Sequence, residues 1–180
     1  MTATDSNADV GRRRPADDVL LARGVAVIRI LFGLTFLLNG LAKLFEFHRV
    51  HIGPYVANLI DKADAKFILG AEVNHNARYH LPLLRRITND FVQPHWGAFQ
   101  WGLTAVELVA GALLLAGLFS RIGALVALGP IVFLFFVYFS NDRWVPEQPL
   151  ELIPLLVLAV VPSGRAWGLD ARRRPRRWPL

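Results

Sequence analysis

The stretch Phe99–Phe119, FQWGLTAVELVAGALLLAGLF, is long and apolar enough to cross a bilayer, and it carries one carboxylate, Glu107, near its middle. A helix of about 20 residues rises roughly 30 Å, the thickness of a hydrocarbon core. A lone charge at that depth costs roughly 2.5–3.5 kcal/mol, so such groups face the interior of a bundle and find a partner. A second apolar stretch, Gly24–Leu44, contains Arg29. We therefore expect a helical bundle in a membrane, in which Arg29 and Glu107 share one pocket.

The composition agrees with a membrane protein. The chain has 180 residues, of which 54% are hydrophobic, and its mean hydropathy of +0.38 lies above the range usual for soluble proteins. It contains no cysteine, so disulfides and thiolate chemistry within this chain are excluded. We assign the net charge of +6 to basic segments beside membrane spans rather than to nucleic-acid binding, because no nucleic-acid-binding module is visible.

The pattern of apolar runs divides the chain into a membrane domain between two tails. Residues 1–18 are polar and predict a disordered cytoplasmic tail, 19–170 form the membrane domain, and 171–180 form a basic cytoplasmic tail. The fold class is all-α, a polytopic four-transmembrane-helix bundle with a helical cap in the outer connection. The predicted spans are 24–44, 98–119, 122–139 and 147–161, and the outer cap is 45–97.

The first span has two interpretations. The run Arg12–Arg14 before it resembles the start of a secretory signal, with Gly40–Ala42 as a cleavage site. We favour an uncleaved helix, because the apolar run continues past the length of a signal core. Charges and small residues share one stripe of this helix, at Arg29, Gly33, Phe36, Gly40 and Lys43. The glycines of the stripe would let a neighbouring helix approach closely.

The outer connection is too charged to be a span. Apolar residues at helical spacing predict two short amphipathic helices, over Val56–Leu69 and from Leu83 to Phe91. All the histidines lie in this connection, and we expect them at the surface rather than in a metal site, because no motif fixes ligand spacing. They are His48, His51, His75, His80 and His95.

The distribution of positive charge predicts the orientation. With both termini inside, the inner segments 1–23, 120–121 and 162–180 carry eleven Lys and Arg residues, and the longer outer segments carry seven. Because cytoplasmic loops carry the excess of Lys and Arg, we expect a multi-pass protein of the bacterial inner membrane with both termini in the cytoplasm. The 45–97 connection then lies outside.

Further polar groups lie at the outer ends of the spans. Lys43 and Glu151 form a plausible second pair, and Asn39 lies one turn below Lys43. With Glu107 these residues would line a polar cavity that opens outward, with Trp101 and Tyr138 on its walls. Three interpretations stay open: charges that only fix helix register, a site for a small polar ligand or a quinone head group, and a proton relay. No nucleophile lies beside a base, so no catalytic residue is assigned.

Three pieces of sequence, in this order and spacing, resemble the DoxX family of small bacterial membrane proteins. They are Ile28–Gly33 running to Asn39–Leu44, Glu107–Gly111 followed by Leu115–Leu118 and Arg121, and the ending Gly164–Asp170. The resemblance implies a four-helix membrane bundle related to the membrane subunit of thiosulfate:quinone oxidoreductase, in a family linked to sulfur metabolism and oxidative-stress defence. It carries over Arg29, Glu107 and Asp170 as polar-site or structural residues.

The function expected from this resemblance is an inner-membrane subunit of an oxidoreductase or redox-defence assembly. Such a subunit would bind a quinone or a small sulfur compound in a polar pocket within the membrane, with protein partners and no covalent cofactor. The competing interpretation is a non-enzymatic membrane scaffold whose outer cap docks an extracytoplasmic protein. A small transporter is less favoured, because no inverted repeat is visible.

Overall fold

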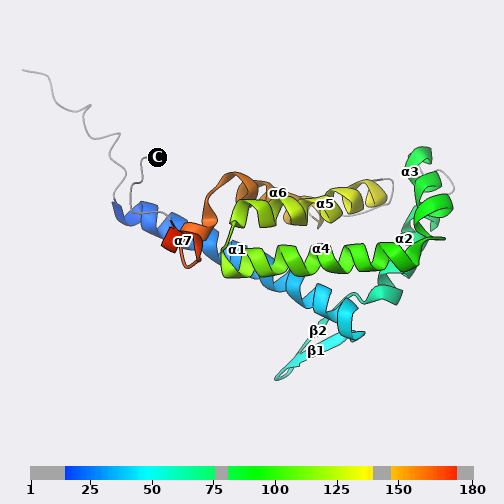
Figure 1. Ribbon diagram of the computed structural model, residues 1–180, viewed down its shortest axis with the longest axis horizontal. Coiled ribbons are helices and arrows are strands. Elements are labelled where there is room, and N and C mark those ends of the chain that lie inside the picture. Colours follow the sequence, from blue (N-terminus) through cyan, green and yellow to red (C-terminus); the bar gives the residue numbers. More distant parts are fainter. Residues whose placement is uncertain (1–14, 76–80, 140–146, 174–180) are drawn as a thin grey trace, which may run out of the picture.

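The computed structural model describes residues 15–75, 81–139 and 147–173. Helices dominate this part of the chain, and four of them run along the long axis of the molecule (Figure 1). These are α1 (Pro15–Phe45), α4 (Trp96–Ala116), α5 (Ser120–Tyr138) and α6 (Glu147–Val160). Three of the four, α1, α4 and α5, are long and apolar enough to cross a membrane, whereas the apolar run of α6, Pro149–Val160, is shorter. The predicted helical membrane protein is thus confirmed at the level of fold class.

Helix α1 begins earlier than the apolar run that predicted it. Pro15 suits the first turn because its missing N–H would have no helical partner there, and Asp17 and Asp18 complement the positive end of the helix dipole. The prediction of disorder for residues 15–18 was therefore wrong, and the rest of that tail lies outside the described residues. The same holds for most of the basic tail, of which residues 171–173 belong to α7 (Asp170–Arg173).

The predicted close approach of a neighbouring helix to the glycine stripe of α1 is confirmed, and the neighbour is α4. A methyl group added at Gly33 would collide with the backbone of Leu115, and one added at Gly111 would collide with the backbone of Leu37. The two backbones therefore touch without side chains between them, an arrangement common between membrane helices. The main core cluster fills the space between α1, α4, α5 and α6, with Phe36, Ala110, Leu114, Ala124, Ala127, Leu128, Leu155 and Leu158 buried.

The turn between α4 and α5 lies slightly earlier than predicted. Gly117, with φ +62°, ends α4 in the left-handed conformation that glycine adopts without steric cost. Phe119 then precedes α5, which begins at Ser120 rather than at residue 122. Pro130 lies inside α5, as the sequence required. Near this turn, the 3₁₀ segment η2 (Ser163–Arg165) and α7 pack at the end of the bundle that we call the inner end.

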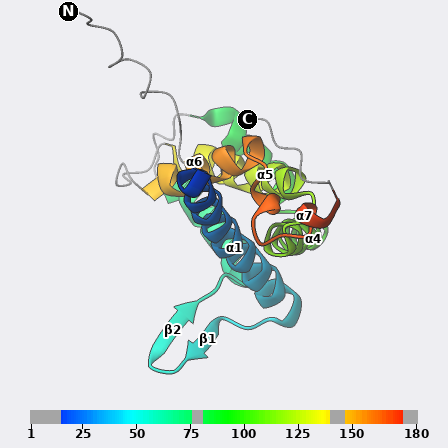
Figure 2. The same cartoon turned by 90° about the vertical axis from the view of Figure 1, so that its left-hand side faces the viewer.

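The connection between α1 and α4 contains a β-hairpin that the sequence analysis missed. Strand β1 (Arg49–Ile52) pairs antiparallel with β2 (Tyr55–Asn58) around a two-residue turn in which Gly53 has φ +59°. The first predicted amphipathic helix was therefore wrong over residues 56–58, because the tight turn pairs two strands across it. The hairpin projects sideways from the end of α1, away from the other helices (Figure 2).

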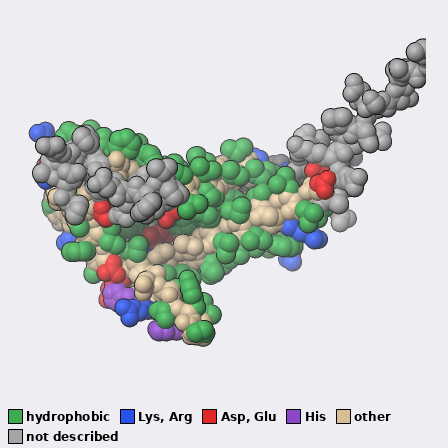
Figure 3. Space-filling view, turned by 180° about the vertical axis from the view of Figure 1, so that it is seen from behind, with side chains coloured by type: hydrophobic (Ala, Val, Ile, Leu, Met, Phe, Trp, Pro, Cys, Tyr) green, Lys and Arg blue, Asp and Glu red, His purple; other side chains and the backbone are tan. Residues whose placement is uncertain are grey.

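Among the described residues after β2, 62–75 and 82–92 are helical, which overlaps both predicted helices with shifted bounds, whereas residues 59–61 are not helical. Helix α2 (Lys62–His75) starts where Asp61 caps it, since the Asp64 N–H donates to Asp61 Oδ1 over 2.8 Å. Helix α3 (Pro82–Arg86) continues into the π-helical segment η1 (Ile87–Val92). Together α2, α3 and η1 cover the outer end of α4 and α5. Hydrophobic side chains spread over much of the visible face of the helices, as a lipid-facing surface requires (Figure 3).

Candidate functional site

The buried charges form two separate clusters, and the predicted pairing of Arg29 with Glu107 was wrong. Glu107 instead pairs with Lys43, whose ammonium lies 3.0 Å from Oε1 and 2.9 Å from Oε2. Gly40 packs against Leu108 and brings α1 and α4 together one turn from Lys43, so the lysine reaches the carboxylate. Lys43 is only 2% exposed.

Arg29 joins the inner ends of several elements. Its fully buried guanidinium donates to carbonyls in the last turn of α4, those of Leu114 and Leu115, and to those of Ala166 and Trp167, the last two at 3.3 Å each. These carbonyls lie at a helix end and in a loop, and that of Leu114 also accepts from the Gly117 N–H. Arg29 therefore ties the segment after α6 to the α1–α4 pair.

Asp170 completes this inner cluster. Its two carboxylate oxygens accept hydrogen bonds from the backbone N–H groups of Phe119, at 2.9 Å, and Ser120, at 3.2 Å. Asp170 thus caps α5 from a distant part of the chain. Gly117 and Gly164 leave no room for a side chain beside Arg29 and Asp170. We call Arg29, the 117–120 turn and the 163–170 loop the inner latch, and its contacts are structural.

The outer cluster connects α1 to the cap. Lys43 Nζ also donates to the carbonyl of Ile60 over 2.9 Å, and Asn39 Oδ1 accepts from the N–H of Ile60 over 3.1 Å. Both backbone polar groups of one residue are therefore held by side chains of α1. This clamp fixes the segment between β2 and α2 directly above Glu107.

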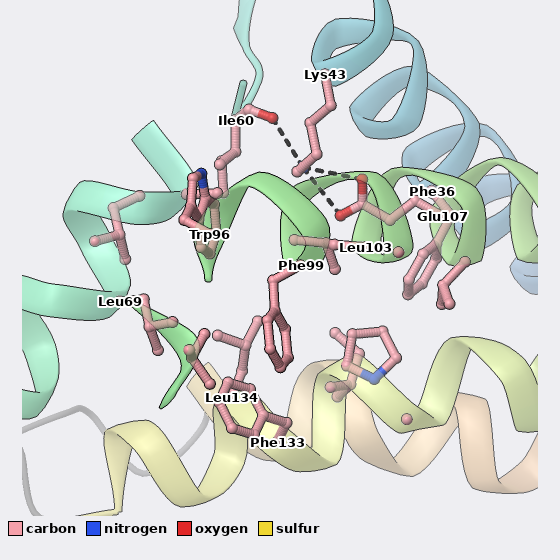
Figure 4. A pocket seen from close by; sticks show the side chains of 18 of the residues that line it. Phe36, Lys43, Ile60, Leu69, Trp96, Phe99, Leu103, Glu107, Phe133 and Leu134 are labelled. Carbon is pink, nitrogen blue, oxygen red and sulfur yellow. Dashed lines mark hydrogen bonds and ion pairs between the residues drawn. The ribbon is translucent and has the colours of Figure 1, made fainter. Parts of the chain in front are cut away.

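A cavity of about 720 Å³ opens between α4 and α5, beneath α2, and reaches Lys43 and Glu107 (Figure 4). Its walls are mostly aliphatic with several aromatic side chains, among them Phe99 and Phe133, whose rings lie near each other in Figure 4. Gly102 and Gly129 contribute room, because a Cβ at either position would meet nothing within 4 Å. The volume lies within the range of small-molecule sites, which is about 300–1,000 Å³.

The polar end of the cavity offers complementary groups to a ligand. Glu107 Oε1 accepts the hydrogen bond from Lys43, whereas Oε2 is buried and accepts none from any described residue, although the ammonium lies close by. Each carboxylate oxygen has two lone pairs, so Oε2 can accept a further hydrogen bond from a donor in the cavity while the ion pair with Lys43 stays in place. The ammonium, for its part, is a donor. The end therefore suits a head group that carries carbonyl or hydroxyl oxygens.

The remaining predicted site residues fall in different places. Tyr138 lines the cavity, as expected. Trp101 does not line it but lies on the surface, where the Lys62 ammonium sits 4.2 Å from the ring centroid. Glu151 is exposed on α6, so its predicted pairing with Lys43 was wrong, because Lys43 turns inward to Glu107. The glycines did not reveal the cavity in the sequence, because glycine also occurs where two helices pack closely, as at position 111.

One group of side chains in the cap has metal-ligating chemistry. His48 Nδ1 lies 3.3 Å from Asp61 Oδ2 and 3.2 Å from Asp64 Oδ2, and the three ligand atoms lie within 4.8 Å of one another. One imidazole with two carboxylates suits a divalent transition-metal ion. Asp61 already serves as the cap of α2 and His48 is largely exposed, which is also the arrangement of an ordinary surface ion pair.

The two polar centres therefore differ in kind. The inner latch joins segments of the chain to one another through backbone contacts, whereas the outer cluster borders an apolar cavity. Among the described residues that line this cavity, Lys43 and Glu107 are the charged ones. No protein-family model, no curated protein and no solved structure matches the chain.

Proposed function

We propose that the chain is a quinone-binding membrane subunit of an oxidoreductase or redox-defence assembly. The observation that carries the proposal is the apolar cavity, lined by aliphatic and some aromatic side chains, with one buried ion pair at its polar end. The resemblance to the DoxX family supports the same class of function. In this proposal the protein lies in the bacterial inner membrane, α6 is a fourth span and both termini are cytoplasmic.

A quinone matches both parts of the cavity. Its planar ring fits between aromatic side chains such as Phe99 and Phe133, and its isoprenoid tail suits the apolar walls. A quinone carbonyl would accept a hydrogen bond from Lys43, and a quinol hydroxyl would donate to a carboxylate oxygen of Glu107. A small sulfur compound would use only the polar end, so the apolar volume favours the quinone.

The electrons would come from a partner protein. The chain contains no cysteine, and the described cavity lining offers neither a thiol nor a histidine. What this chain supplies is a place in the bilayer where the head group is held and desolvated. The predicted protein partners are therefore part of the proposal, and they carry the redox group.

The glycines that make room in the cavity give a sharp test. Gly102→Leu should fill the cavity without a clash, whereas Gly24→Leu, on the exposed part of α1 and equally free of neighbours, leaves the cavity open. Titration of the purified protein with a short-chain ubiquinone, followed by tryptophan fluorescence, reports binding near Trp96 in the wall. We expect saturable quenching in the wild type and in Gly24→Leu, and at least a roughly tenfold loss of affinity in Gly102→Leu, equal to about 1.4 kcal/mol.

Equal affinity in the two leucine variants would contradict the assignment of the cavity. Absence of saturable quenching in the wild type would contradict quinone binding itself.

A second candidate is a membrane scaffold that docks an extracytoplasmic protein. The observation in its favour is that the cap exposes large apolar side chains, among them Phe67 at 75% and Leu83 at 71%. Purification in a mild detergent separates the two candidates. Co-purified redox subunits or quinone support the first, whereas a stable complex free of redox groups supports the scaffold.

A further inference from the structure

The β-hairpin has one apolar face and one polar face. Residues paired directly across an antiparallel ladder share a face, and successive pairs alternate. The pairs Val50–Ala57 and Ile52–Tyr55 therefore form one face, which is wholly apolar or aromatic. The pairs Arg49–Asn58 and His51–Val56 form the other, with a cation, an amide and an imidazole.

The apolar face is uncovered where it is largest. Ile52 is 64% exposed and Tyr55 is 65% exposed, and no second sheet packs on the hairpin within the described part of the chain. A two-stranded hairpin in water is marginal without a surface to cover one face. The exposed tip therefore needs an apolar environment from outside the chain.

The position of the hairpin indicates what that environment is. The hairpin leaves the end of α1, a helix long and apolar enough to cross a membrane, and projects to the side of the bundle. In Figure 1 the hairpin points back along the long axis of the molecule, so its tip lies beside the helices rather than beyond their ends. Seen from behind, hydrophobic side chains lie along one side of the hairpin to its tip, while charged and histidine side chains lie on the other side (Figure 3).

We propose that the hairpin lies in the lipid interface beside α1, with its apolar face against the acyl chains. Arg49 at the root then meets the phosphate layer, and Tyr55 takes the depth at which tyrosine is enriched. The outer edges of a two-stranded sheet keep unpaired backbone groups, which cannot enter the hydrocarbon core. The tip therefore reaches the boundary between head groups and acyl chains, the depth of other amphipathic surface elements.

The inference does not depend on the ligand of the cavity. It follows from the strand register, the exposure of the tip and the place of the hairpin relative to a span. The occupant is a phospholipid leaflet because the end of α1 from which the hairpin leaves also exposes apolar side chains, Leu44 and Phe45. The leaflet is the one at which α1 ends, whichever way the protein is oriented.

Single-cysteine labelling tests the inference cleanly, because the chain has no cysteine of its own. Ile52→Cys and its neighbour His51→Cys place the same probe on opposite faces of one strand. Each variant is labelled with the fluorophore NBD and reconstituted into vesicles of phosphatidylethanolamine and phosphatidylglycerol. Doxyl-labelled lipid then quenches from the acyl region, and iodide quenches from water.

We expect doxyl lipid to quench the probe at 52 several-fold more than the probe at 51, and iodide to show the reverse order. Tyr55→Cys should behave like Ile52→Cys. Equal iodide quenching at 51 and 52 would show an aqueous hairpin and overturn the proposal. Protection at 52 from both quenchers would overturn it too, because the occupant would then be a protein surface. Unchanged helix content in circular dichroism confirms that the labelled variants are folded.

Discussion

Lys43 and Glu107 neutralise each other in the interior, and neither has another charged partner among the described residues. Removing one member of a buried pair leaves an uncompensated charge, which costs about 3–5 kcal/mol. We therefore expect Lys43→Ala to lower the free energy of unfolding by about that amount. The double variant Lys43→Met, Glu107→Gln should recover most of the loss, and reversible unfolding in mixed micelles measures both.

The exposed Lys66 of α2 supplies the matched control. Lys66→Ala removes the same charge from the surface and should change the free energy of unfolding by less than about 0.5 kcal/mol. If Lys43→Ala and Lys66→Ala cost the same, the pair is not a buried one.

Arg29 gives a second prediction, because its planar fork serves four carbonyls at once. Lysine keeps the charge but presents a single ammonium, so Arg29→Lys should destabilise the protein by about 1.5–3 kcal/mol. Limited proteolysis after residue 163 should accelerate in parallel. The exposed Arg23 on the same helix is the control, and a loss as large in Arg23→Lys would contradict the assignment.

At the scale of residues, the sequence predicted the burial of three charges but not that Glu151 is exposed, nor how the buried ones pair. Arg29, Lys43 and Glu107 are all inside, as the cost of a charge in hydrocarbon requires. The partners of Arg29 are backbone carbonyls at the end of α4 and in the loop after α6, and no pattern of side chains in the sequence predicts such partners. Lys43 reaches Glu107 only because the glycines of α1 and α4 remove the space between the helices.

At the scale of elements, the contact of α1 with α4 sets the geometry of the site. Gly111→Ala places a methyl group into the backbone of Leu37 and should cost about 1–3 kcal/mol through overpacking. Gly24→Ala, with open space around it, should instead gain up to about 1 kcal/mol from helix propensity. Unfolding in mixed micelles measures both variants, and a gain in both would contradict the close packing.

The helices were easier to predict than the hairpin. Continuous apolar runs fixed α1, α4 and α5 to within a few residues at most ends, whereas the first turns of α1 depend on Pro15 and two aspartates outside the apolar run. Strands β1 and β2 have four residues each. Such short strands show too little alternation of apolar and polar residues to be distinguished from a helix with apolar residues three or four apart. The dipeptide Gly53-Pro54 was the signal that would have divided the two strands.

At the scale of the whole molecule, the charge bias gives a prediction about orientation. Eleven basic residues in the inner segments against seven outside should place the C-terminus in the cytoplasm. Green fluorescent protein fused after Leu180 should fluoresce, and alkaline phosphatase at the same point should be inactive. Active phosphatase there would reverse the orientation, or show that α6 does not cross the membrane.

The length and hydropathy of the apolar segments predicted the helical bundle, because a segment in hydrocarbon must pair its backbone N–H and C=O groups within its own helix. The cavity did not follow from them, because it depends on where two helices diverge. Gly102 and Gly129 mark that divergence only once the backbones are placed, and in the sequence they look the same as the packing glycines.

The clamp on Ile60 connects the segment that covers the cavity to the ion pair at its polar end. If α2 moved away from the bundle, the hydrogen bond from Lys43 to the Ile60 carbonyl would break. The ammonium could then donate that hydrogen bond to an oxygen of a ligand in the cavity. Admission of a molecule past the cap and rearrangement of the bonds to Glu107 would thus be a single event. The amide proton of Ile60, held by Asn39, would exchange with solvent deuterium at the rate of that event.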